Sequence, residues 1–168
     1  YDWDDFVAME WRPAEIKFVP EHFKFEQSEF RGVSWQNVGA WYRDLAADRY
    51  LVDTTPSPAD DSLAFRPRLK RLYERVIDET RYVLISIGIS GWQPAKAADT
   101  RTCGYGDCKG LATLLISDIK AYGIEVYPVL ILTRQNGAVN PDFPEFGFNH
   151  VIAVAVEGTD TVWMDATC

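Results

Sequence analysis

Residues 104–133, GYGDCKGLATLLISDIKAYGIEVYPVLILT, carry most of the information about the fold. From Cys108 onward, apolar residues recur every three to four positions, which is the period of a helix with one buried face. Gly123 stands where a glycine commonly ends a helix, because glycine adopts a left-handed backbone without strain. Residues 124–133 are then apolar and β-branched, which predicts a strand directly after the helix.

Two more strands are predicted after this segment. Residues 149–156 and 161–165 are rich in apolar and β-branched side chains, and the short connection between them contains Gly158. A loop rich in Gly, Pro and Asn, residues 134–148, separates the first of them from the strand at 124–133. We expect the three strands to form an antiparallel sheet.

Helices are predicted on the N-terminal side. Ser34 has the side chain of an N-cap, and the apolar spacing after it predicts a helix over residues 35–47. A loop-like composition over 53–62 precedes a second helix at about 67–80, and residues 82–89 favour a short strand. Helices followed by antiparallel strands indicate an α+β fold.

The 168 residues are enough for one domain with a substantial core. Residues 1–33 are rich in aromatic side chains and show no clear period, so we interpret them as a linker or the tail of a preceding domain. Residues 34–168 are then one domain. The chain starts at Tyr1 without an initiator Met and ends on Cys168 directly after a predicted strand. It is therefore interpreted as a fragment of a longer protein, and C-terminal truncation of the domain stays open.

Composition excludes several classes of function. Lys and Arg number 17 against 25 Asp and Glu, which gives a net charge of −8, and the only basic cluster is residues 66–71. We therefore expect no nucleic-acid partner. No apolar run approaches the ~18 residues that cross a bilayer, so we expect no membrane insertion by this segment. The two histidines lie far apart and no Cys-x-x-Cys pair is present, so neither a metal nor another cofactor is predicted.

Cys108 is the first candidate for a reactive side chain. It lies at a predicted helix start, where unpaired N–H groups and the helix dipole lower the pKa of a thiol. The glycines around it leave the thiol uncrowded, and a backbone N–H there can bind an oxyanion. Asp107 is better placed to cap the helix than to react. Taken alone, such a cysteine is more often a small apolar group at a helix start.

His150 and Asp165 are the candidate partners of Cys108. A turn centred on residues 157–160 makes His150 face Thr167 with Asp165 diagonally adjacent, and a shorter turn makes His150 face Asp165 directly. Both registers put the imidazole and the carboxylate on one face of the sheet. A lone histidine is more often structural. Cysteine, histidine and aspartate in this order, however, are the nucleophile, base and orienting group of a thiol acyl-transfer triad.

The second half of the chain resembles the transglutaminase-like core, a relative of the papain-type cysteine protease fold. The matching motifs are Gly-Trp-Gln-Pro at 91–94, Gly-Asp-Cys-Lys at 106–109, Ala-Tyr-Gly-Ile at 121–124, Phe-Asn-His at 148–150 and Trp-Met-Asp-Ala-Thr at 163–167. The resemblance implies a catalytic helix packed on an antiparallel sheet. Residues 1–50 resemble the connector that follows a β-rich domain in secreted bacterial multidomain proteins. That likeness implies an extended or helical N-terminal connector, flanking domains as partners, and a periplasmic, cell-envelope or secreted location.

By resemblance, Cys108 is the nucleophile, His150 the general base and acid, and Asp165 the residue that orients His150. Members of this family use a side-chain donor to help bind the oxyanion. Gln93 is the first candidate for that role, followed by Trp92 and Tyr105. The candidates rest on position in the sequence alone, and Gln93 is equally placed to be a turn residue before a proline.

The reaction stays open among three hypotheses. The favoured one is a cysteine peptidase or amidase that acts on a peptide or protein substrate with an accessible amide, through a thioester. The same triad also fits a transglutaminase, in which an amine replaces water as the acceptor. The third is a non-catalytic binding module of a secreted or envelope protein. A disulfide between Cys103 and Cys168 would suit an oxidising compartment and leave Cys108 as the free thiol, although two buried free thiols are the more ordinary alternative.

Overall fold

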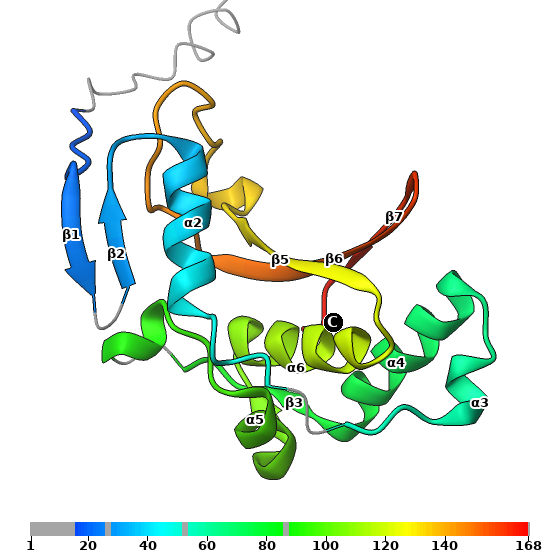
Figure 1. Ribbon diagram of the computed structural model, residues 1–168. Helices are drawn as coiled ribbons and strands as arrows, with labels where there is room; N and C mark the ends of the chain where they lie inside the picture. The colour runs from blue at the N-terminus through cyan, green and yellow to red at the C-terminus, as the bar shows by residue number, and fades with distance from the viewer. Residues whose placement is uncertain (1–15, 26–27, 52–53, 86–87, 168) are drawn as a thin grey trace, which may run out of the picture.

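A three-stranded antiparallel sheet and a helix packed against it form the centre of the molecule (Figure 1). The computed structural model describes residues 16–25, 28–51, 54–85 and 88–167. The sheet has the order β5-β6-β7, with β5 at Glu125–Ile131, β6 at His150–Glu157 and β7 at Asp160–Met164. Together with the helices, this sheet confirms the mixed α+β class.

The turn between β6 and β7 sets the register of the sheet. Val156 pairs with Thr161 and Glu157 with Asp160, so the turn has two residues, and Gly158 takes a positive φ of 60° within it. This is the first of the two registers expected from the sequence. Its consequence is that side chains of β6 lie beside those of β7 on a common face.

Helix α6, Cys108–Ala121, is the most buried element of the chain. One face of the sheet, through Val126, Ala153 and Ala155, packs on this helix. Helix α4, Phe65–Glu79, covers another side with Leu69, Leu72 and Val76. The helix and its C-terminal glycine agree with the prediction, since Gly123 has a φ of 69° just after the last turn.

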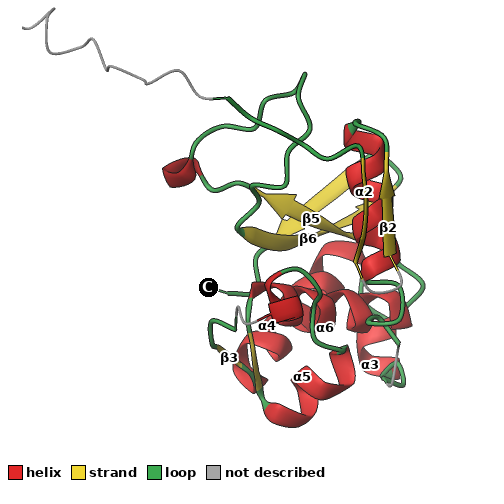
Figure 2. Cartoon of the chain, turned by 90° about the vertical axis from the view of Figure 1, so that its left-hand side faces the viewer, coloured by secondary structure: helices red, strands yellow, loops and turns green. Residues whose placement is uncertain are grey.

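A second, aromatic core lies between helix α2 and a hairpin. Helix α2 covers Trp35–Leu45, and the hairpin joins β1, His22–Phe25, to β2, Ser28–Arg31. Figure 2 shows α2 standing beside β2, above α6. Rings of Phe23, Phe30, Trp41, Trp92 and Phe146 meet at centroid distances of 5.0 to 6.1 Å. The cluster therefore fastens the segments around Trp92 and Phe146 onto α2.

The caps and ends of the N-terminal helices follow local sequence signals. The Ser34 hydroxyl accepts a hydrogen bond from the N–H of Asn37 at 3.1 Å, which confirms the predicted N-cap of α2. The predicted loop at 53–62 contains one short helix, α3, at Pro58–Asp61. Proline at the first position of a helix costs no hydrogen bond, because the N–H of that position has no partner within the helix.

The predicted strand at 82–89 is wrong over most of its length. Only Arg81–Tyr82, β3, is a strand, and it pairs in parallel with β4, Tyr105–Gly106. The partner ends there because α6 begins two residues later. The N–H of Val83 still donates to the Gly106 carbonyl at 2.8 Å, but residues 84–85 have no described strand to pair with. Residues 86–87 lie outside the described residues, and Gly88–Gly91 form a short 3-10 helix.

Helix α5, Ala97–Cys103, was not predicted from the sequence. It packs against the first turn of α6 and helps to fix the position of the helix start. In the described part of the chain, no helix combines the length and apolar character needed to cross a bilayer.

Candidate active site

The start of α6 places Cys108 as the first helical residue. Asp107 is the N-cap: its Oδ1 accepts a hydrogen bond from the N–H of Gly110 at 2.9 Å, as the sequence predicted. Its Oδ2 accepts a hydrogen bond from Lys109, and both side chains are nearly buried. Asp107 therefore holds the first turn of the helix through a backbone contact and an ion pair.

The glycines around Cys108 serve close packing of the backbone. A Cβ built at Gly110 would lie 3.2 Å from Oγ1 of Thr100, and one at Gly106 would lie 3.2 Å from Cγ2 of the same residue. These distances are shorter than ordinary contacts of a Cβ atom. The start of α6 can therefore lie this close to Thr100 of α5 only because Gly106 and Gly110 have no side chain. The glycines do not open the thiol to solvent, because Cys108 is only 6% exposed.

The environment of the Cys108 thiol also differs from expectation. Burial raises its pKa, while Lys109 and the backbone N–H groups of Val151 and Lys109 act to lower it and Asp107 acts to raise it. The net pKa is above the ordinary thiol value. The helix start was expected to lower it, but loss of solvent around a buried thiolate outweighs that contribution. The resting thiol is therefore protonated at neutral pH.

His150 and Asp165 meet on the sheet. Nε2 of His150 lies 2.7 Å from Oδ2 of Asp165, across β6 and the end of β7. Because an ionised carboxylate only accepts hydrogen bonds, the imidazole carries a proton on Nε2. In a neutral ring, Nδ1 is then the nitrogen that accepts a proton. The expected proximity of the two side chains is confirmed.

Asp165 is itself held by several contacts. Its Oδ1 accepts hydrogen bonds from the N–H of Thr167 at 3.1 Å and from its hydroxyl at 2.7 Å, and the Tyr73 hydroxyl donates to the Asp165 carbonyl at 3.0 Å. Partial burial acts to raise the pKa of Asp165, but the hydrogen bonds from His150 and Thr167 outweigh it and the pKa is lowered. The carboxylate is ionised and fixed in orientation at neutral pH.

One cavity of about 250 Å³ brings Cys108 and His150 together. Trp92, Leu84 and Tyr42 line it as well. The thiol lies beside the backbone of Val151, the residue after the histidine. Asp165 stands behind His150 through the hydrogen bond described above. Cys108 and His150 thus line one small cavity, and Asp165 contacts His150 from outside its lining.

The structure separates the three candidate oxyanion donors. Trp92 lines the cavity of Cys108, but Gln93 and Tyr105 line a neighbouring cavity of about 360 Å³ that also includes Cys103. The Gln93 side chain donates from Nε2 to the carbonyl of Leu45 at 3.1 Å. This contact ties the segment after the 3-10 helix Gly88–Gly91 to the end of α2, which is a structural role. Only Trp92 of the three is placed with the thiol.

Three residues near the site were missed from the sequence. Thr167 and Tyr73 hold Asp165, as described above. Tyr42 is buried and lines the same cavity as Cys108, and burial, followed by the charges of Tyr50 and Cys108, raises the pKa of its hydroxyl. Thr167 belongs to the Trp-Met-Asp-Ala-Thr motif and was therefore within reach of sequence reasoning. Tyr42 lies on the apolar stripe of α2 and carried no separate signal.

The remaining site predictions concern metals and the disulfide. Among the described residues, no three His, Cys, Asp or Glu side chains converge in a way that could hold a metal ion. Cys103 is exposed and has a free thiol. This free thiol does not agree with the suggested bridge between Cys103 and Cys168, and Cys168 itself lies outside the described residues.

Comparison with known proteins adds a likeness of fold. No family model and no curated protein sequence matches the chain. A structure of a putative cysteine protease from Cytophaga hutchinsonii is 22% identical, with a TM-score of 0.47, and the match covers 61% of this chain and 32% of that one. A putative protease from Parabacteroides distasonis ATCC 8503 is 12% identical, with a TM-score of 0.56, and the match covers 75% of this chain and 26% of the other. The chain thus spans about a third or less of these structures, and the second shares its mixed α+β fold.

Proposed function

We propose that this chain is a thiol-dependent hydrolase of amide bonds in peptides or proteins, with Cys108 as nucleophile, His150 as general base and acid, and Asp165 as orienting residue. The observation that carries the proposal is the bond between His150 Nε2 and Asp165 Oδ2, which leaves Nδ1 as the proton acceptor beside the cavity of Cys108. The helix α6 packed on an antiparallel sheet supports a papain-like arrangement.

The proposed reaction begins with a neutral thiol. As Cys108 attacks the amide carbon, its proton moves to Nδ1 of His150 and the carbonyl oxygen becomes an oxyanion. The backbone N–H groups at the start of α6 and the indole N–H of Trp92 are the proposed donors to that oxyanion. His150 then gives the proton to the leaving amine, and a thioester on Cys108 remains. Water, deprotonated by His150, hydrolyses the thioester and restores the thiol.

Asp165 has a defined task in this scheme. During each half-reaction His150 carries a positive charge, and the carboxylate of Asp165 stabilises that charge while keeping Nε2 protonated. The lowered pKa of Asp165 keeps the carboxylate ionised throughout. The histidine therefore exchanges its proton only at Nδ1.

Site-resolved alkylation tests the proposal. Iodoacetamide is added to the chain, and labelling of Cys108 and Cys103 is followed by peptide mass spectrometry. We expect His150→Ala to slow labelling of Cys108 at least tenfold while labelling of the exposed Cys103 stays at the parent rate. Equal labelling of Cys108 with and without the imidazole would remove His150 from the mechanism.

The acceptor is tested separately. A mixture of peptide amides is incubated with the chain in the presence and absence of a primary amine such as methylamine, and the products are identified by mass. Hydrolysed peptides in both conditions support the hydrolase. Products that carry the amine in place of the amide support the transglutaminase alternative. Labelling of Cys108 with no turnover of any amide supports the binding module.

A further inference from the structure

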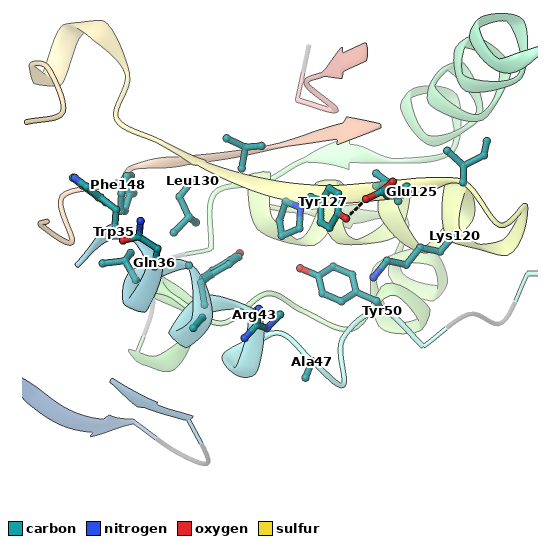
Figure 3. Close-up of a pocket in the computed structure, with 18 residues that line it drawn as sticks. Trp35, Gln36, Arg43, Ala47, Tyr50, Lys120, Glu125, Tyr127, Leu130 and Phe148 are labelled. Atoms are coloured by element: carbon teal, nitrogen blue, oxygen red, sulfur yellow. Dashed lines mark hydrogen bonds between the residues drawn. The ribbon is translucent and has the colours of Figure 1, made fainter. Parts of the chain in front are cut away.

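A large groove adjoins the Cys108 cavity. It has a volume of about 920 Å³ and lies between helix α2 and strand β5 (Figure 3). Its lining is mostly apolar and includes Trp35, Val38, Tyr50 and Pro128. This volume falls in the range of ligand-binding pockets and is larger than the voids that imperfect packing leaves.

The groove and the Cys108 cavity are adjacent. Tyr42, Leu130 and Phe148 line both of them. Figure 3 shows Leu130 and Phe148 at one end of the groove and Tyr50, Lys120 and Glu125 at the other. A chain that enters at the Tyr50 end would therefore approach the thiol at the Leu130 end.

The wall formed by β5 is the edge of the sheet. Among the described strands β5 has a partner only on the side of β6. Six consecutive residues of β5, 125–130, line the groove. Since neighbouring side chains of a strand point to opposite faces, a cavity that touches all of them lies along the edge. An edge carries backbone groups that an extended peptide can pair with, and Pro128 suits such a strand because it lacks an N–H.

We infer that this groove binds an extended, apolar segment of the substrate, on the acyl side of the amide that Cys108 attacks. The inference rests on the proposed acyl-transfer function and adds the class of substrate. From Glu125 to Leu130 the strand rises about 17 Å, which an extended segment of about five residues matches. The acyl side is assigned because it stays on the protein as the thioester, whereas the amine side leaves.

Gly39 offers a way to close the groove without disturbing the fold. It lines the groove from helix α2, and a Cβ at this position would have no neighbouring atom within 4 Å. Because its φ is not in the left-handed region, Gly39→Leu adds a side chain that the helix tolerates well. Asp44→Leu places the same side chain on an exposed position of the same helix outside the groove and serves as the matched control.

The test compares two irreversible probes with the same reactive end. One is acetyl-Val-Leu-Val-Leu-Ala chloromethyl ketone and the other is acetyl-Ser-Asn-Ser-Thr-Ala chloromethyl ketone. Labelling rates of Cys108 are measured by mass spectrometry, and each is divided by the rate with iodoacetamide in the same variant. We expect the apolar probe to react at least tenfold faster than the polar one in the parent and in Asp44→Leu. In Gly39→Leu the preference should fall below threefold.

Equal rates of the two probes in the parent, or a preference that survives in Gly39→Leu, would overturn the inference. A binding measurement separates this result from failure of the proposed chemistry. The fluorescein-labelled apolar peptide, as an unreactive amide, is titrated with the Cys108→Ala variant and followed by fluorescence polarisation, with and without Gly39→Leu. Binding that Gly39→Leu weakens tenfold supports the groove even if no probe labels the thiol. If sedimentation shows a dimer that Gly39→Leu dissociates, the groove belongs to self-association and the inference is wrong.

Discussion

Replacement of Asp165 by asparagine tests the proposed site most directly. The N–H of Thr167 donates to Oδ1 of Asp165 at 3.1 Å, so an asparagine keeps its oxygen on that side and turns its amide nitrogen toward His150. The amide nitrogen of the asparagine is a donor, so it can bond only to a His150 Nε2 that carries no proton. The neutral imidazole then carries its proton on Nδ1. The base then has its proton on the nitrogen that should accept one. Loss of an oriented general base costs about 10²–10⁴ in rate.

The assay follows alkylation of Cys108 and hydrolysis of a peptide amide in the parent and in Asp165→Asn. Nitrogen chemical shifts of the His150 ring report the tautomer independently of rate. We expect a slower reaction together with a shift of the proton to Nδ1. A parent-like rate with the tautomer reversed would refute the role of Asp165.

Because the pKa of Asp165 is lowered, its stabilising contribution is present above its ordinary value of 3.8 and is lost as the pH falls through the lower pKa of the folded state. The free energy of unfolding of Asp165→Asn should therefore lack this part of its dependence on acidic pH.

Three further outcomes follow from the buried charges and the thiol. Because burial raises the pKa of Cys108, its alkylation rate should still be rising with pH above the ordinary thiol value of 9.0, and a plateau below that pH would contradict the burial argument. Asp107→Ala removes the helix cap and leaves Lys109 without its carboxylate, so urea unfolding should show a loss of about 3–5 kcal/mol, and Asp107→Asn should lose less because it keeps the cap. Arg101→Ala leaves the fully buried Asp118 without a cation and should cost about 3–5 kcal/mol, part of which Asp118→Asn in the same chain should recover.

The parts of the fold that could be predicted are those with strong local patterns. The apolar stripe of α6, the glycine after it and the N-cap serine of α2 are local signals, and each has its expected counterpart in the structure. The meeting of His150 and Asp165 followed from strand alternation and a short turn. Such features need no knowledge of how distant segments pack.

The parts that could not be predicted depend on tertiary contacts. Residues 83–85 have the composition of a strand, yet Leu84 is 72% exposed because the adjacent partner strand is only two residues long. Helix α5 has seven residues and buries only Ala97 and Thr100, too few for a periodic signal. The partner of Gln93 is a carbonyl 48 residues earlier in the chain. The raised pKa of the Cys108 thiol could not be predicted either, because burial in the folded chain is its main cause.

The order of the site residues along the chain also sets a sequence of events during synthesis. Cys108 leaves the ribosome before either of its partners, and its helix becomes buried only when β5 and β6 pack on it. The roughly 60 residues between Cys108 and Asp165 take about 3–12 s to translate at about 5–20 residues per second. During that interval the nascent thiol lies at the start of a helix without its base. The proposed acyl transfer can therefore begin only after the β6–β7 hairpin has docked, which would tie the onset of that chemistry to completion of the sheet.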